Sequence, residues 1–447
     1  MKKVAFHNLG CKVNSYELDG ISQMFQKRGY EIVDFAQKAD VYIVNTCTVT
    51  NIADRKSRQM LGRARRQNPD AVVVAAGCFV QNDPDGAASC DYIDIAVGNN
   101  RKSEIVDIVE AYLAGRCEDR TKQITVSDLN TPCEYENISI SKTSGHTRAF
   151  MKIQDGCNQF CSYCAIPLAR GRARSRRIED IEKEAVSLGA NGYKEIVITG
   201  IHLSSYGLDT YNTFADNGNT NTALLDAIET VAAKDGIERI RLGSLEPRLL
   251  TEDFVRRLSA VPKLCPHFHI SLQSGCDSVL ARMNRHYDTA EFAEKVELVR
   301  KYFEHPAITT DIIVGFPQET EEEFETTRAF LQEINLYECH IFKYSRRKGT
   351  VADRMKGQLT DAVKSERSAI LIGESEKRKC DFTAWYDGKK VTVLTEDTEE
   401  IDGRAWTVGY TPEYVKVYMP ETQSGKITEI LCFIDNCRMI GQEVSGL

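Results

Sequence analysis

Three cysteines near the middle of the chain have the spacing of an iron–sulfur site. Cys157, Cys161 and Cys164 form a C-x3-C-x2-C pattern. Three thiolates can hold three corners of a cubic 4Fe–4S cluster, which leaves the fourth iron free to bind and activate a small molecule. Structural zinc normally takes four ligands, and no fourth Cys or His follows at finger spacing. A zinc site and unrelated core cysteines are the alternatives.

A second set of cysteines is predicted from the order of the secondary-structure elements. The patterns of the first 117 residues predict helices at 14–27 and 54–66, and strands at 3–8, 41–44 and 71–76. Cys11, Cys47 and Cys78 each come just after one of these strands. Because the carboxyl ends of parallel strands meet at one edge of a sheet, we expect a second site of three thiolates there. The alternative is three separate buried cysteines.

The length and composition of the chain limit its possible folds and its cellular compartment. A chain of 447 residues is too long for one core and indicates two or three domains. Its 42% hydrophobic and 27% charged residues are typical of a soluble globular protein. We expect no membrane span and no signal peptide, because no apolar run approaches the ~20 residues a span needs. Fifteen cysteines without an export signal predict the reducing cytoplasm, where cysteines bind metal or stay free.

The net charge of the chain argues against strong, sequence-independent binding to nucleic acid, but it does not exclude local basic patches. The net charge is −8. A basic stretch at 55–66 is interpreted as the solvated face of a helix. A denser run follows the cysteine triplet, broken by Gly and Ser into a loop. It could bind an RNA phosphate or a ligand carboxylate by bidentate contacts, and its arginines are Arg170, Arg172, Arg174, Arg176 and Arg177.

The remaining chain divides into a linker and two further domains. Residues 118–146 are polar without sustained periodicity and predict a linker. Residues 147–374 predict six strand–helix units, hence a parallel α/β sheet that is either a partial barrel or doubly wound. Its strands are expected at 149–154, 195–199, 240–245, 268–272, 309–314 and 340–344. The triplet follows the first of these strands, at the end where barrel enzymes carry their chemistry.

The last segment, 375–440, predicts a small all-β barrel. Its strands are expected at 381–385, 390–395, 414–417 and 425–432. Exposed aromatic and basic side chains here would suit RNA, whose unstacked bases settle on aromatic faces; ordinary core aromatics are the alternative. These residues are Tyr386, Trp406, Tyr410, Tyr414, Lys389, Lys390 and Arg404.

The triplet resembles the signature of the radical S-adenosylmethionine (SAM) enzymes. In that superfamily the open iron chelates SAM, and electron transfer cleaves it to a 5′-deoxyadenosyl radical. The resemblance implies that Cys157, Cys161 and Cys164 bind the cluster and that Tyr163 packs near the adenine. It also implies that residues at several strand ends contact SAM. At each of these positions, the alternative is an ordinary turn residue. These residues are Thr199 and Gly200 near the methionine amino group, Ser244, Glu246, Gln273 and Ser274 near the methionine or ribose, and Gly315 near the adenine.

Over essentially its full length the chain resembles the methylthiotransferases, with a last part similar to a TRAM domain. The motifs are Leu9-Gly10-Cys11-Lys12-Val13-Asn14-Ser15-Tyr16-Glu17, Asn45-Thr46-Cys47 and Gly77-Cys78. The resemblance implies a second 4Fe–4S cluster on Cys11, Cys47 and Cys78. These enzymes insert sulfur and a methyl group into an unreactive C–H bond.

Three branches of that family differ in substrate. The motif around Cys11 and the stretch 148–170 look most like the branch that converts N6-threonylcarbamoyladenosine, next to the tRNA anticodon, to its 2-methylthio derivative. N6-isopentenyladenosine in tRNA and a ribosomal-protein aspartate are the alternatives within the family. A zinc or RNA-binding module without catalysis is the alternative outside it. The expected partners are tRNA, a reducing electron donor and a sulfur donor.

Overall fold

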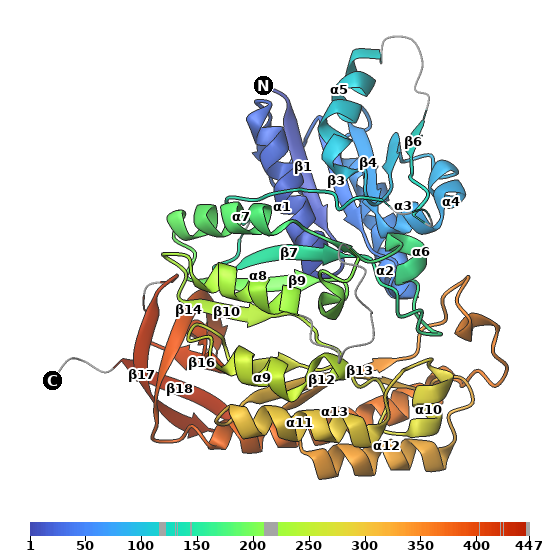
Figure 1. Cartoon of the computed structure of the whole chain (residues 1–447). Helices are drawn as coiled ribbons and strands as arrows, with labels where there is room; N and C mark the ends of the chain where they lie inside the picture. Colours follow the sequence, from blue (N-terminus) through green and yellow to red (C-terminus); the bar gives the residue numbers. More distant parts are fainter. Residues whose placement is uncertain are drawn as a thin grey trace.

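The computed structural model describes the chain except residues 116–121, 130, 132, 144, 210–221, 402, 421, 423 and 444–447. Part of the predicted linker at 118–146 therefore lies outside the described residues. Figure 1 shows three successive units, an N-terminal α/β domain in blue, a central curved sheet in green to orange and a red C-terminal barrel. In the described part of the chain, no helix is both long and apolar enough to cross a membrane.

The N-terminal domain is a six-stranded parallel sheet between two layers of helices. The strand order is β2 (Glu31–Val33), β1 (Lys3–Asn8), β3 (Val41–Thr46), β4 (Val72–Gly77), β5 (Ile95–Val97) and β6 (Gln123–Thr125). One face packs on α1 (Lys12–Lys27) and α5 (Ile105–Gly115). The other face packs on α2 (Asn51–Gln67), α3 (Cys78–Asn82) and α4 (Pro84–Ala88). The strands and helices predicted in this domain are confirmed.

The segment predicted as a linker contributes to the fold. Strand β6 pairs in parallel with β5 at the edge of the sheet. Farther along, Ile138 and Ile140 are buried, and the Ile140 backbone N–H donates to Glu184 in the central domain at 3.1 Å. Backbone hydrogen bonds alone can hold an edge strand in place. Such a strand therefore does not need the apolar periodicity by which a strand is recognised in a sequence.

The central domain is a partial barrel of six parallel strands. Strands β10 (Arg239–Leu242), β9 (Glu195–Gly200) and β7 (Ala149–Asp155) form one sheet, with the short antiparallel β8 (Arg174–Ser175) at its edge. A second sheet contains β11 (His267–His269), β12 (Ala307–Val314) and β13 (Glu338–Lys343). Parallel bridges from Ile240 to Leu264 and from Leu245 to Ile270 join them. The outer helices are α7 (Ile178–Ala190), α8 (Thr222–Ala232), α9 (Glu252–Ser259), α11 (Thr289–Tyr302) and α12 (Glu321–Ile334), with α6 (Ile166–Arg170) and α10 (Asp277–Arg282) in connecting loops.

All six strands predicted for this domain are confirmed, and of the two predicted architectures the partial barrel is the one observed. Alternate side chains of its strands pack against the outer helices in one large core. The other side chains of each strand face the inside of the barrel.

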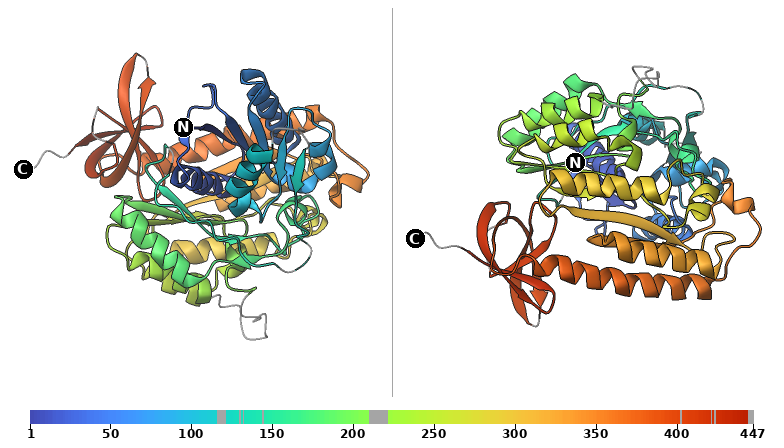
Figure 2. Two further views of the ribbon diagram at one scale, coloured as in Figure 1. Left: turned by 90° about the horizontal axis from the view of Figure 1, so that it is seen from above. Right: turned by 60° about the horizontal axis from the view of Figure 1, so that its bottom comes forward.

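The C-terminal domain is a closed five-stranded barrel at one end of the long helix α13 (Asp361–Ala384), as Figure 2 shows. Its strand order is β14 (Lys390–Ile401), β15 (Arg404–Tyr410), β16 (Lys416–Met419), β18 (Arg438–Glu443) and β17 (Ile427–Asp435). The strand predicted at 381–385 is wrong, because these residues finish α13, where Phe382 packs on Tyr337 at 4.5 Å between ring centroids. The predicted boundary at 374/375 lies inside the same helix.

The aromatic residues predicted to face RNA are largely used to dock the C-terminal barrel. Tyr386 is 1% exposed. The guanidinium groups of Arg148 and Arg241 both lie 4.6 Å from the ring of Tyr414. Arg241 also donates to the carbonyl of Pro412 at 2.8 Å. Cation–π contacts of this kind stabilise an interface that excludes water, so these rings are not an open platform for bases.

One disulfide departs from the expectation for a reducing compartment. Cys380 near the end of α13 is bonded to Cys437 in the turn before β18. The bond joins the long helix to the C-terminal barrel. The cysteines of the two predicted cluster sites are all unpaired.

A buried group of ion pairs joins the N-terminal domain to the central domain. We call it the Glu17 network; its members are Glu17, Lys102, Lys152, Asp155, Arg170 and Arg174, all buried. Glu17 of α1 accepts from Lys152 of β7 at 2.7 Å and from Arg170 of α6 at 2.9 Å, and it also pairs with Lys102. Burial opposes ionisation of Glu17, but Arg170, Lys102 and Lys152 hold the pKa of its carboxyl well below the usual range.

We expect Glu17→Gln to lower the free energy of unfolding by about 3–5 kcal/mol, because it leaves buried cations without their shared partner. Urea denaturation at neutral pH measures this. The same substitution at Glu252, whose pair with Lys301 at 2.6 Å is exposed, is the control and should leave the free energy of unfolding nearly unchanged. Equal losses in the two variants would show that the network does not hold the domains together.

Candidate iron–sulfur sites

The triplet loop is fixed at the carboxyl end of the barrel. It begins after β7 at Gly156, whose φ of +68° brings the backbone close to the opposite strand; a Cβ there would lie 1.9 Å from the carbonyl oxygen of Arg172. Ser162 anchors the far side, where its N–H donates to Met283 at 2.9 Å and its carbonyl accepts from Ala352 at 2.7 Å. The loop therefore holds its three thiols in place without a metal.

A cavity of about 140 Å³ opens over the triplet. Of the residues predicted to contact SAM, Tyr163, Ser244 and Glu246 line it together with the three cysteines. Other lining residues come from the triplet loop and α6 (Gln159 and Ile166), from the loop after α10 (Arg285) and from the ends of neighbouring strands (Ile201, His202, Leu245 and Ser271). The cavity thus unites the triplet with the ends of several barrel strands, as in other barrel enzymes.

Five of the predicted contact residues do not line this cavity, namely Thr199, Gly200, Gln273, Ser274 and Gly315. Ser274 is buried, with its hydroxyl 3.2 Å from that of Thr327. The N–H of Gly315 donates to Glu319 at 2.7 Å, and a Cβ at this glycine would lie 2.3 Å from the side chain of Lys364. Both residues are occupied by structural contacts on the outer side of their strand ends.

The sequence analysis missed Arg285, which connects the triplet to the strand ends. Its guanidinium donates to the Cys161 sulfur at 3.1 Å and to Glu246 at 2.5 Å. Glu246 also lies 3.6 Å from His202. Burial opposes ionisation of Glu246, but Arg285 and His202 lower the pKa of its carboxyl. No short-range spacing links Arg285 to the triplet, since 120 residues separate them in the chain.

The donor set of the triplet fits a cluster. Each thiol accepts a hydrogen bond: Cys157 from the Gln159 N–H at 3.4 Å, Cys164 from the Ile166 N–H at 3.5 Å, and Cys161 from Arg285. Burial raises the pKa values of Cys157 and Cys164 to about 12. Iron must therefore displace protons when it binds, and the hydrogen bonds then stabilise the thiolates.

The structure brings Cys11, Cys47 and Cys78 to one edge of the N-terminal sheet. Cys11 precedes α1, Cys47 follows β3, and Cys78 begins α3 after β4. A Cβ at Gly10 would lie 3.1 Å from the Cys47 sulfur, and burial followed by the neighbouring thiols raises the pKa of Cys47 to about 11. Among the described residues, no three Cys, His, Asp or Glu side chains converge as ligands of a single ion would. Cluster thiolates stand farther apart, because each binds its own iron.

Cationic and amide groups surround this second trio. Asn99 donates to the Cys78 sulfur at 3.4 Å and to the carbonyl of Ala169 at 2.6 Å. Arg170 counteracts the effect of burial on the pKa of Cys11. The Nε of Arg170 is buried and has no hydrogen-bond partner among the described residues. A cluster bound here would supply acceptor atoms for such a donor, so the donor set fits.

The arginine run is not the RNA-binding loop that the sequence predicted. Arg170 and Arg174 belong to the Glu17 network, and Arg176 is buried against Glu184 at 2.9 Å. These three side chains are inside the protein, which corrects their predicted role. Arg172 and Arg177 remain exposed.

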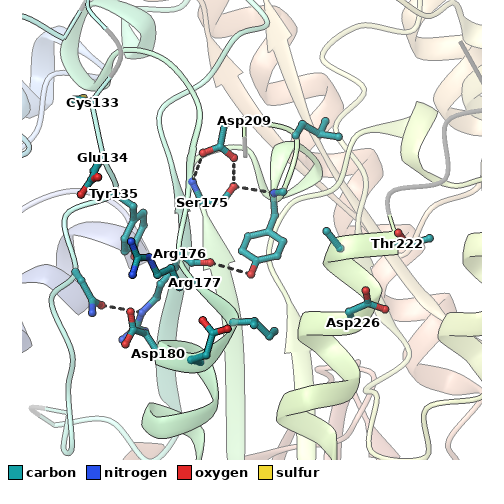
Figure 3. A pocket seen from close by; sticks show the side chains of 17 residues that line it. Cys133, Glu134, Tyr135, Ser175, Arg176, Arg177, Asp180, Asp209, Thr222 and Asp226 are labelled. Atoms are coloured by element: carbon teal, nitrogen blue, oxygen red, sulfur yellow. Dashed lines mark hydrogen bonds between the residues drawn. The ribbon is translucent and has the colours of Figure 1, made fainter. Parts of the chain in front are cut away.

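A second, larger hollow has no residue of either cysteine trio in its wall. Figure 3 shows its wall, including Arg176 and Arg177 and the hydrogen bonds between Ser175 and Asp209. Its volume is about 960 Å³. The lining is rich in carboxylates, from Glu134, Glu179, Asp180, Asp209 and Asp226. Such a surface repels phosphate groups and is not suited to RNA.

Comparison with known proteins identifies the family. Residues 3–98 match the family described as Uncharacterized protein family UPF0004, and residues 151–331 match the Radical SAM superfamily. The threonylcarbamoyladenosine tRNA methylthiotransferase MtaB of Bacillus subtilis is 41% identical over 96% of this chain and 93% of its own length. The chain belongs to the tRNA methylthiotransferase family. A tRNA-2-methylthio-N(6)-dimethylallyladenosine synthase of Clostridium botulinum (strain Loch Maree) is 34% identical over 88% of this chain and 86% of its own.

Solved structures agree on the fold of this methylthiotransferase. The radical SAM methyltransferase TsrM of Kitasatospora setae has a TM-score of 0.56 at 15% identity, over 76% of this chain and 73% of its own. The cobalamin-dependent radical SAM enzyme OxsB has a TM-score of 0.50 at 10% identity, over 95% and 65%. The chain is a sulfur-transferring radical SAM enzyme, a fold that implies SAM and a 4Fe–4S cluster.

We expect Arg285→Met to weaken SAM binding roughly tenfold, because it removes a charged hydrogen bond and leaves Glu246 without its partner. Equilibrium dialysis of SAM against the iron-loaded protein measures this. Arg282→Met is the control, since Arg282 pairs with Glu323 at 2.6 Å rather than with a cavity residue. Similar SAM affinity in the Arg285 variant and the wild type would exclude this role.

Proposed function

We propose that this methylthiotransferase converts N6-threonylcarbamoyladenosine next to the tRNA anticodon to its 2-methylthio derivative. One observation carries the proposal: two trios of thiols are held by helices that touch. Helix α6, which follows the triplet, packs on α3, which begins with Cys78. Two cluster sites held by neighbouring helices suit a reaction in which one activates a carbon and the other delivers sulfur.

In this proposal Cys157, Cys161 and Cys164 hold the SAM-binding cluster, and Cys11, Cys47 and Cys78 hold an auxiliary 4Fe–4S cluster. The clusters and SAM supply the one-electron, radical and sulfur-transfer chemistry. The protein orients the reactants and keeps water away. In the same proposal the cavity residues Ser244, Glu246 and Arg285 bind the polar groups of SAM, while Tyr163 packs edge-on against Phe316 beside the triplet.

Charge balance supports the auxiliary cluster. In direct ion pairs the Glu17 network has four cations and only two carboxylates, Glu17 and Asp155. Opposite charges lower the pKa of both carboxyls against the effect of burial, so both are ionised. Uncompensated buried cations are costly. Arg170 brings part of this excess positive charge next to the second trio. A cluster with three thiolates would add negative charge there.

The proposal also requires contacts to tRNA, a reducing electron donor and a sulfur donor. Beside the triplet, the guanidinium of Arg172 lies 4.5 Å from the ring of Phe160, which is 44% exposed. An exposed aromatic face with an arginine suits an unstacked base and its phosphate. We assign the first tRNA contacts to this pair.

The test of the function is deletion of the gene and mass spectrometry of tRNA nucleosides. We expect 2-methylthio-N6-threonylcarbamoyladenosine to disappear and its unmethylthiolated precursor to accumulate, with return on complementation by the wild-type gene. Persistence of the modified nucleoside would refute the substrate. Loss of the 2-methylthio form of N6-isopentenyladenosine instead would assign the chain to the other tRNA substrate.

Counting iron and sulfide separates the two clusters. After anaerobic reconstitution we expect about eight irons per chain in the wild type and about four in either Cys157→Ala or Cys11→Ala, since each 4Fe–4S site contributes four. Cys157→Ala should abolish formation of 5′-deoxyadenosine from SAM, whereas Cys11→Ala should retain it. Four irons in the wild type, or SAM cleavage by Cys157→Ala, would contradict the assignment.

A further inference from the structure

One side of helix α2 carries a row of exposed cations. The basic stretch at 55–66 lies in this helix, whose buried residues Ser57, Leu61 and Ala64 face the sheet. Because a helix has about 3.6 residues per turn, the exposed cations share the opposite side. Eleven residues separate the first of them from the last, or about 16 Å of helix. We call this surface the α2 face; its cations are Arg55, Lys56, Arg58, Arg63 and Arg66.

The positive charge of the α2 face is not neutralised by the protein. Asp54, the only carboxylate in α2, pairs with Arg347 at 2.5 Å. Arg58 lies 3.9 Å from the exposed Asp83. The other four cations make no ion pair within the part of the chain that the structure describes. In a chain of net charge −8, an uncompensated basic face is suited to an anionic partner.

Exposed arginines on other helices show a different pattern, because each has a carboxylate partner. Arg28 at the end of α1 pairs with Asp107 at 2.6 Å. Arg257 of α9 pairs with Glu229 at 2.7 Å. A solvated helix surface normally mixes both signs of charge in this way. The α2 face therefore differs from an ordinary solvated surface.

Helix α2 is attached directly to the second cysteine trio. The Cys47 N–H donates to the hydroxyl of Ser57 at 3.3 Å, and the same hydroxyl donates to the Cys47 carbonyl at 3.3 Å. The first turn of α2 is held by Arg347, which donates to Asn51 at 2.7 Å and to Thr48 at 2.6 Å. A ligand bound along α2 would therefore have a fixed position relative to Cys47.

The loop after β13 connects the α2 face to the triplet. It contains Arg347, and its Ala352 N–H donates to Ser162 of the triplet loop at 2.7 Å. Between them, a Cβ at Gly349 would lie 3.2 Å from Leu168 of α6. Lys348, between the α2 contact and the α6 contact, is exposed. The positive surface thus continues from α2 towards the helix that follows the triplet.

We infer that the α2 face binds phosphates of the tRNA anticodon stem. This inference rests on the proposed function for its tRNA substrate. Four of the five cations are arginines, whose planar guanidinium groups bind phosphate with two parallel hydrogen bonds. A row about 16 Å long can contact several phosphates of one strand. Phosphate contacts fix the register of a nucleic acid, so contacts along α2 would place the target base relative to the site that would deliver sulfur.

The test uses reconstituted full-length protein and an anticodon stem-loop that contains N6-threonylcarbamoyladenosine. Fluorescence anisotropy measures its affinity between about 50 and 200 mM KCl. We expect the combined variant Arg55→Gln, Arg63→Gln and Arg66→Gln to bind roughly tenfold more weakly at the lowest salt concentration. The slope of log affinity against log salt should fall in magnitude by about 2–3, since each lost phosphate contact removes about 0.7–0.9.

Two further variants separate charge at this face from charge in general. Lysine at the same three positions keeps the charge and should retain the wild-type slope. The matched control removes three exposed lysines of α1, α7 and α11 and should bind as the wild type does; its substitutions are Lys27→Gln, Lys183→Gln and Lys301→Gln. Iron content checks the fold of each variant. If the triple glutamine variant loses iron, each arginine is substituted alone, and a fall in slope of about one is required.

The outcomes distinguish this inference from the proposed function. An unchanged slope in the glutamine variant refutes the inference alone, provided that the wild type methylthiolates the stem-loop. Unchanged RNA binding together with weaker binding of a flavodoxin would refute it as well, and would assign the face to an acidic electron donor. A wild type that binds the stem-loop through the α2 face but leaves it unmodified would support the inference and refute the proposed substrate.

Discussion

The relative position of the two cysteine trios depends on the Glu17 network. Burying charged groups is costly, and such a group is retained only where every member is paired. Here Glu17 from the first helix of the chain and Asp155 from the first strand of the barrel share Arg170. Because Arg170 ends α6, only six residues after Cys164, the network fixes the triplet loop relative to Cys11 and Cys78.

The network also accounts for the electrostatics of the second trio. Burial alone disfavours thiolates, and it raises the pKa of Cys11 and Cys47. Arg170 opposes this effect at both residues. The same excess of positive charge that would destabilise an isolated interface thus favours an anionic group at the cysteine edge. The charges that join the two domains therefore also set the electrostatic surroundings of the second trio.

The barrel contributes an inner wall of polar side chains. The register of the strands sets the level of each side chain on this wall. Ser244, Glu246 and Ser271 line the triplet cavity, and His269, two residues before Ser271, stacks on His340.

Much of the architecture follows from local patterns in the sequence. The triplet needs only eight residues to specify its spacing, and strand–helix periodicity was sufficient to place Cys11, Cys47 and Cys78 at one sheet edge. The six barrel strands were likewise visible as short apolar runs. These features are encoded within a few turns of chain, because each depends on the residue types of a single element.

Tertiary structure alone decided how the charged and aromatic groups are used. Arg170 is a buried partner of Glu17 rather than an RNA contact, although the two are 153 residues apart. Arg285 joins the triplet from 124 residues beyond Cys161, and residues 381–385 are helical because α13 continues across the domain boundary. The sequence by itself determined which cysteines form the two trios. Whether an arginine is paired or free depends on distant residues that only the folded chain brings into contact.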